Sequence, residues 1–186
     1  MHAFLVSVVA VALAEIGDKT QLLSFVLAAR LRSPWAIVLG ILVATLANHA
    51  VAATVGVWIA GLLGPLAMRW IIGGAFLAFG VWALVPDTLE SEPRLHAAGA
   101  FVTTLVAFFL VEMGDKTQLA TIALAARYQT LMAVVVGTTL GMLVANVPAV
   151  LLGEALAERL PLRALRWGAA ALFLALGAAT LAGLGA

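Results

Sequence analysis

Long apolar runs, separated by short segments rich in charged residues, proline or glycine, dominate the pattern of the chain. Because a helix needs about 20 apolar residues to cross a bilayer, this pattern predicts six membrane-spanning helices. The expected spans are residues 3–29, 35–61, 66–86, 98–126, 131–157 and 164–185. Pro148 falls inside the fifth span, where it is expected to kink the helix. The pattern therefore indicates an all-α, polytopic membrane protein.

An internal repeat divides the chain into two halves. The segment EIGDKTQLLSFVLAAR, which starts at Glu15, returns as EMGDKTQLATIALAAR, which starts at Glu112, with eleven of sixteen positions identical. The same offset of 97 residues pairs His49 with Asn146, so the duplication extends beyond the motif. Since three spans are an odd number, the second half must enter the membrane inverted. We predict a three-helix repeat over residues 1–86, a polar cytoplasmic linker over 87–97 and a second, inverted three-helix repeat over 98–186.

Composition restricts the class of partner. The chain is 65% hydrophobic and 10% charged, with a mean hydropathy of +1.15, so the lipid bilayer is its main surrounding. A net charge of +1 gives no reason to expect a nucleic-acid partner, and the absence of cysteine excludes disulfides and thiolate metal sites. The first apolar run is too long for a signal peptide and holds charged residues, so we expect it to be a retained helix.

The arginines predict the orientation. Six fall on one side of the expected membrane and two on the other: Arg30, Arg32, Arg94, Arg159, Arg163 and Arg166 against Arg69 and Arg127. By the positive-inside rule the six-arginine side is cytoplasmic. Both termini are then expected to be extracytoplasmic.

Charged residues lie in the middle of the first and fourth spans. They comprise both lysines of the chain and four of its nine acids: Glu15, Asp18, Lys19, Glu112, Asp115 and Lys116. Each such charge costs about 2.5–3.5 kcal/mol at the centre of a spanning helix, so these groups must face the protein interior, form pairs or be neutralised. Two ammonium groups offset two of the four carboxylates, which leaves a charge of −2 that one divalent cation would neutralise.

Helical geometry suggests how these groups meet. On a continuous helix at 100° per residue, Glu15, Asp18, Lys19 and Gln21 share one arc, and Gly17 lies opposite, where it would allow a neighbouring helix to approach closely. The second copy repeats this arrangement, with Gly114 in the place of the first glycine. We therefore expect the two arcs to face each other across a pseudo-two-fold axis.

The candidate ligands are hard oxygen donors. Carboxylates together with the amide oxygens of Gln21 and Gln118 suit Mn²⁺, Ca²⁺ or Mg²⁺. Without metal, carboxylates crowded together in a low-dielectric interior take up protons, so metal and proton would compete for one site. Lys19 and Lys116 are expected to act as gates or to tune the charge of the site. In the alternative interpretation, each glutamate pairs with the lysine four residues later and merely holds its helix in place.

A second group of polar residues lies near the motifs: Ser24, Thr121, Asn48, His49 and Asn146. They would extend a polar path through the membrane, and His49 would suit a proton relay. Hydrogen bonds that only stabilise helix packing explain them equally well.

The doubled motif, E-I-G-D-K-T and E-M-G-D-K-T, resembles the doubled E-x-G-D-[KR]-[TS] signature of the calcium/manganese cation-proton antiporter family, which includes the Golgi transmembrane protein 165 and bacterial manganese exporters. The resemblance covers essentially the whole chain. It implies export of Mn²⁺, with Ca²⁺ as an alternative, in exchange for protons. It also implies that the metal site consists of Glu15, Asp18, Glu112 and Asp115. A prokaryotic inner membrane is the expected location, because the extra N-terminal helix of eukaryotic relatives is not seen.

Two other functions remain open at this point: a divalent cation channel, since acidic rings also select cations, and an exporter of a small amino acid. An enzyme is not expected, because the chain has no HExxH motif and no nucleophile with an adjacent base. No prosthetic group is expected either; Mn²⁺ or Ca²⁺ is the transported substrate and H⁺ the counter-ion. A second copy of the chain, in a homodimer, is a further candidate partner.

Overall fold

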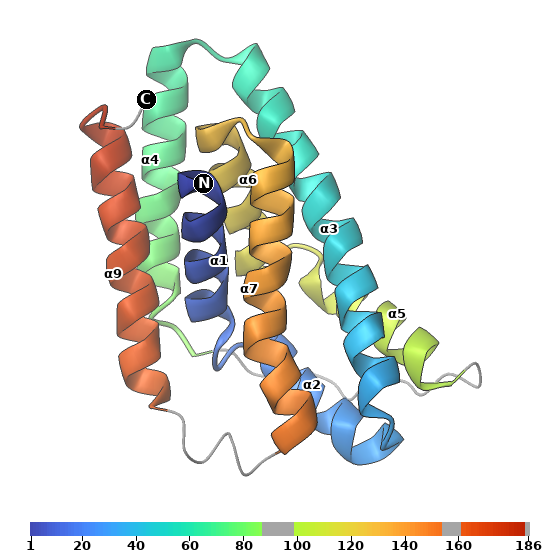
Figure 1. The fold of residues 1–186 in the computed structure, drawn as a ribbon. Helices are drawn as coiled ribbons and strands as arrows, with labels where there is room; N and C mark the ends of the chain where they lie inside the picture. The colour runs from blue at the N-terminus through green and yellow to red at the C-terminus, as the bar shows by residue number, and fades with distance from the viewer. Residues whose placement is uncertain (87–98, 154–160, 185–186) are drawn as a thin grey trace.

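The computed structural model describes residues 1–86, 99–153 and 161–184, and all regular structure within them is helical (Figure 1). The described helices of the first half are α1 (His2–Glu15), α2 (Lys19–Leu31), α3 (Pro34–Leu62) and α4 (Pro65–Trp82). Those of the second half are α5 (Ala100–Glu112), α6 (Lys116–Tyr128), α7 (Leu131–Leu152) and α9 (Leu162–Leu181). The all-α class is confirmed. The predicted linker and the predicted end of the fifth span at residue 157 lie outside the described residues, so the exact division of the chain stays a prediction.

Four described helices, α3, α4, α7 and α9, are long and apolar enough to cross a membrane. The prediction of continuous helices over 3–29 and 98–126 is wrong, because each of these spans breaks at its acidic motif. Figure 1 shows α2 continuing from α1 towards the end of the bundle where α3 begins, and α6 leading in the same way to the start of α7. Each pair of short helices thus accounts for one predicted crossing.

The two halves have the same helices in the same order, and they are inverted relative to each other. A methyl group placed on Gly73 of α4 would lie 3.4 Å from the carbonyl oxygen of Gly177 on α9, and one on Gly80 would lie 3.2 Å from that of Ala170. Ascending positions on α4 thus meet descending positions on α9, so these equivalent helices run antiparallel. This is the geometry of an inverted repeat.

The helices that carry the acidic motifs pack on the opposite repeat. On α7, methyl groups at Gly137 and Gly141 would lie 2.7 Å from Phe4 O and 2.6 Å from Val8 O of α1, so only glycine permits this approach. Gly40 of α3 has the equivalent role towards α5. Pro148 lies inside α7, as predicted. The two repeats therefore interlock rather than stand side by side.

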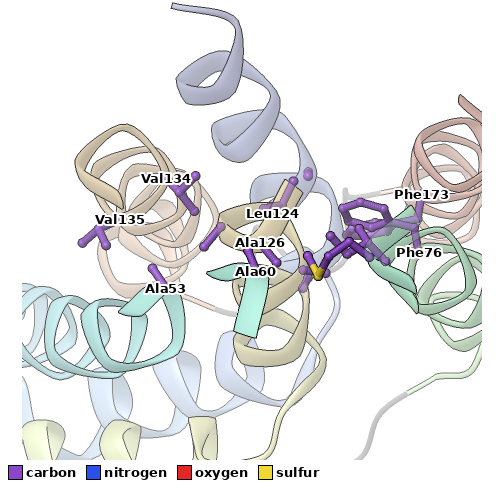
Figure 2. Packing of buried hydrophobic residues seen from close by; sticks show 14 residues of the cluster. Ala53, Ala60, Phe76, Leu124, Ala126, Val134, Val135 and Phe173 are labelled. Atoms are coloured by element: carbon purple, nitrogen blue, oxygen red, sulfur yellow. The ribbon is translucent and has the colours of Figure 1, made fainter. Parts of the chain in front are cut away.

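A packed apolar cluster joins α4, α6 and α9. The rings of Phe76 and Phe173 stack with centroids 6.2 Å apart, and Leu124 and Ala126 of α6 are buried in the same cluster (Figure 2). On the outer surface of α3, Trp35 and Trp58 are both exposed. Their separation of 23 residues corresponds to about 34 Å along the helix, close to the roughly 30 Å of a hydrocarbon core. This spacing is the one expected of tryptophans at the two interfaces of a membrane.

Candidate metal site between the two repeats

The break in each motif is built around a glycine. Gly17 and Gly114 have φ of +83° and +79°, a region that other residues rarely adopt. Each break is closed by the glutamine four residues later: Gly17 N–H donates to Gln21 Oε1 at 2.9 Å, and Gly114 N–H donates to Gln118 Oε1 at 2.7 Å. These bonds satisfy backbone donors that the interrupted helices leave without a carbonyl partner.

The predicted role of these glycines, a close approach of a neighbouring helix, is wrong for Gly114 and holds only in part for Gly17, which a side chain of α9 approaches. A methyl group on Gly114 would meet no atom of the described chain within 4 Å, and one on Gly17 would meet the side chain of Leu162, not a helix backbone. Their function is backbone freedom, since φ above zero is strained for any residue with a Cβ.

Three carboxylates from both repeats converge at the breaks. Glu15, Asp18 and Asp115 are all buried, and one oxygen of each lies within 4.8 Å of the other two. An ion at the centre of such a triangle would be at most about 2.8 Å from each oxygen, close to the 2.3–2.6 Å of calcium–oxygen bonds. Glu15 Oε2 is buried and receives no hydrogen bond from the described residues. A buried carboxylate oxygen of this kind requires a cation or a proton.

Glu112, the repeat partner of Glu15, is equally buried but lies outside this three-oxygen group. Both of its oxygens accept hydrogen bonds from α3: Thr45 Oγ1 donates at 3.3 Å and Asn48 Nδ2 donates at 3.3 Å. The two glutamates thus have different surroundings, because the positions equivalent to Thr45 and Asn48 are Met142 and Ala145 in the second repeat. Sequence reasoning missed Thr45, although a hydroxyl three residues before Asn48 in an apolar span was a usable signal.

The lysines form ion pairs across the repeats. Lys19 Nζ lies 3.0 Å from Asp115 Oδ1, and Lys116 Nζ lies 3.7 Å from Asp18 Oδ1. The alternative interpretation placed Glu15 and Lys19 on successive turns of one helix, but α1 ends at the glutamate and α2 begins at the lysine. The crossed pairs therefore connect the two halves of the molecule at the point where the acids meet.

The environments of the two ammonium groups differ. Lys19 is 27% exposed, whereas Lys116 is 11% exposed, donates to Val85 O at 3.2 Å and lies 5.5 Å from the ring centroid of Trp82. A cavity of about 20 Å³ beside Lys116 also touches Asp18 and Arg166, where α4 ends and α9 begins. This volume is sufficient for a water molecule.

Some of the predicted second group of polar residues reach the site. Asn146 Nδ2 lies 3.5 Å from Glu15 Oε1, and Asn146 Oδ1 accepts a hydrogen bond from Ser24 at 2.8 Å. Gln21 Nε2 donates to Ala145 O at 3.0 Å, which ties α2 to α7. A polar chain therefore leads from α2 through α7 to Glu15.

Thr121 and His49 do not join this chain. Thr121 donates to Thr117 O of its own helix at 2.8 Å, so its hydroxyl has the packing role that was the alternative interpretation. His49 is fully buried, and neither ring nitrogen has a hydrogen-bond partner among the described residues. Its role as a proton relay stays a prediction.

The comparisons with known proteins agree with this geometry. Residues 3–91 and 100–184 each match the family described as "Divalent cation/proton antiporter GDT1", and the two matches begin at the offset of the internal repeat. A protein of Vibrio cholerae serotype O1, named "Putative manganese exporter", is 49% identical over 181 residues, which cover 97% of this chain and 90% of that protein. No solved structure matches. The chain therefore belongs to the divalent cation/proton antiporter GDT1 family.

Proposed function

We propose that this integral membrane protein exports Mn²⁺ in exchange for protons, with the carboxylates of Glu15, Asp18, Asp115 and Glu112 as the ligands of the ion. The observation that carries the proposal is that three buried carboxylates from both repeats each place one oxygen within 4.8 Å of the other two. In addition, Glu15 Oε2 accepts no hydrogen bond from the described chain. The name of the Vibrio cholerae relative supports Mn²⁺ over Ca²⁺.

The charges of the site support exchange rather than simple binding. Four carboxylates and two ammonium groups leave a charge of −2, which one divalent cation neutralises and which protons neutralise when the cation leaves. Both ions then need the same oxygens, so release of one follows binding of the other. Gln21 and Gln118 close the helix breaks, and each amide oxygen keeps a second lone pair with which it contacts the ion.

The asymmetry of the two glutamates supports alternating access. Glu15 belongs to the three-oxygen group, while Glu112 is held by Thr45 and Asn48 on α3. Because the repeats are inverted, a movement that brings Glu112 into the oxygen group and leaves Glu15 with Asn146 opens the site to the opposite side. Lys19 and Lys116 act as gates: each aspartate pairs with its lysine when the site holds no metal and binds the metal when the ion pair opens.

The orientation in the membrane belongs to the same proposal. Four of the described arginines, Arg30, Arg32, Arg163 and Arg166, flank the ends of α2 and α9 that lie at one end of the bundle, and Arg69 and Arg127 lie at the other (Figure 1). We infer a bacterial inner membrane with the first end in the cytoplasm and both termini outside. A reporter fused to the C-terminus tests this, since activity in the cytoplasm would reverse it. The mass of the purified protein tests the predicted homodimer.

Transport in proteoliposomes tests the function. Purified protein is reconstituted with a pH dye and a Mn²⁺ indicator, and an imposed Mn²⁺ gradient is expected to drive protons in the opposite direction. Mn²⁺ flux without a pH change would instead establish a channel. Glu15→Gln, which keeps the volume and removes the charge, should abolish transport while the protein still inserts. Thr54→Val is the control, because this exposed hydroxyl bonds its own helix at Ala50 O. Normal transport by Glu15→Gln would refute the ligand assignment.

A further inference from the structure

An open groove lies at the end of the bundle away from the acidic motifs. The groove, of about 780 Å³, opens between the ends of α3, α6 and α9 and the start of α4. Its walls are largely apolar, with Leu63 and Leu66 among them, and two arginines, Arg69 and Arg127, reach into it. These ends gather at the top of the view in Figure 1.

Both guanidinium groups donate hydrogen bonds to the C-terminal end of α9. Arg69 Nε donates to Leu181 O, and Arg127 donates to the hydroxyl of Thr180 and, at 3.0 Å, to Leu184 O. These bonds occupy some of the five N–H donors of each guanidinium. Arg127 Nε is buried and has no hydrogen-bond partner in the described chain. Both side chains line the groove and retain N–H donors that no described acceptor occupies.

No acid of the described chain balances these two positive charges. The four acids in the described residues are Glu15, Asp18, Glu112 and Asp115, all of which belong to the two motifs. Charged groups at the edge of a low-dielectric region are stabilised by a counter-charge. No described acid competes for these guanidinium groups, so an anion from outside the described chain can bind them.

The surroundings indicate which anion fits. Trp58 and Trp70 are exposed on the segments of α3 and α4 that also carry the groove residues Ala60 and Arg69, and exposed tryptophans are typical of the level of lipid headgroups. Ala60, Met68 and Ile72 line the groove and also belong to the apolar cluster of Figure 2, so packed side chains separate the groove from the carboxylates. A divalent cation would be repelled by two guanidinium groups, and a small free anion would leave the apolar walls unfilled.

We propose that this groove binds an anionic phospholipid, with its phosphate between Arg69 and Arg127 and an acyl chain along the apolar wall. Arginine donors match phosphate oxygens in geometry as well as in charge. Arg69 belongs to the first repeat and Arg127 to the second, so the bound headgroup joins the two repeats at one face of the membrane.

Native mass spectrometry of the purified protein tests the proposal. The protein is titrated with phosphatidylglycerol, with phosphatidylcholine of the same acyl chains, or with inorganic phosphate. We expect wild-type protein to bind phosphatidylglycerol at least about tenfold more tightly than phosphatidylcholine, which corresponds to about 1.4 kcal/mol. The double variant Arg69→Gln/Arg127→Gln should lose this preference. Arg163→Gln, an exposed arginine at the start of α9, should keep it.

Three results would overturn the proposal: equal binding of the two lipids by wild-type protein, an equal loss of preference in the Arg163→Gln control, or displacement of the lipid by inorganic phosphate at similar concentration, which would establish a small-anion site. If the double variant does not fold, Arg69→Lys/Arg127→Lys replaces it. Lysine keeps the charge but not the paired donors, so it should retain a reduced preference, and an unchanged preference would also contradict the arginine geometry.

Discussion

Replacement of Lys19 by methionine separates two roles for the crossed ion pairs. Methionine keeps an unbranched side chain of similar length and removes the ammonium group that lies 3.0 Å from Asp115. If Lys19 only held the repeats together, its loss would weaken both the fold and metal binding. If it tunes the charge of the site, its loss takes the site from −2 to −3, and metal binding should become tighter.

The size of this effect follows from the position of the lysine. Two unit charges 4 Å apart interact by about 4 kcal/mol at an effective dielectric constant of 20 and by about 1 kcal/mol in water. Lys19 is 27% exposed, so the smaller figure is the better guide, and the double charge of the metal roughly doubles it. We expect Lys19→Met to bind Mn²⁺ about 10- to 100-fold more tightly and to turn over more slowly, because the ion leaves the site less readily.

Titration calorimetry in detergent measures the affinity, and the proteoliposome assay measures the rate. The stabilisation of the variant by Mn²⁺ against thermal unfolding should exceed that of wild-type protein, since Asp115 is left buried without its ammonium partner until metal binds. Lys19→Arg keeps the charge and should bind Mn²⁺ within about threefold of wild type, a difference below about 0.7 kcal/mol. Weaker or unchanged binding by Lys19→Met would refute the charge-tuning role.

Three further substitutions test the architecture. Gly56→Ala should destabilise the protein by about 1–3 kcal/mol in thermal unfolding, because the new methyl would overlap Ile122 O of α6. Gly61→Ala on the same helix meets no described atom and should be neutral, so equal shifts would contradict the α3–α6 packing. Gly114→Ala should cost about 1–2 kcal/mol of backbone strain and lower Mn²⁺ transport at least about tenfold, while Gly99→Ala, also at positive φ but outside the motif, should leave transport intact. Asn48→Ala should cost about 1–3 kcal/mol and lower transport, since Glu112 loses a donor; a variant as stable as wild type would show that this contact contributes nothing.

Most of the fold was predictable because the bilayer leaves a membrane protein few possible architectures. The length of each apolar run, the number of runs and the 97-residue offset together led to the inverted repeat that the antiparallel packing of α4 and α9 confirms. The same reasoning correctly placed the acids in the interior, where all four described carboxylates are buried. These features depend on transfer free energies, which are local properties of a sequence.

The geometry of the site was not predictable by the same route. Angles on a helical wheel assume a continuous helix, so they placed Glu15 and Lys19 on one arc, although the chain breaks between them. A glycine between two acids in both copies was a signal for the break, since glycine is unfavourable within a helix. The pairing of Lys19 with Asp115 depends on how the two breaks meet in space, and the spacing of residues within one motif carries no information about this.

The interlocked packing of the repeats has a consequence for how such a chain changes over time. α1 packs closely against Gly137 and Gly141, which lie more than a hundred positions later in the chain, and α5 packs in the same way against Gly40. A bulkier residue in one half is therefore relieved only by a change in the other half. A half on its own would lack the glycine against which its motif helix packs, so each copy depends on the other for this contact.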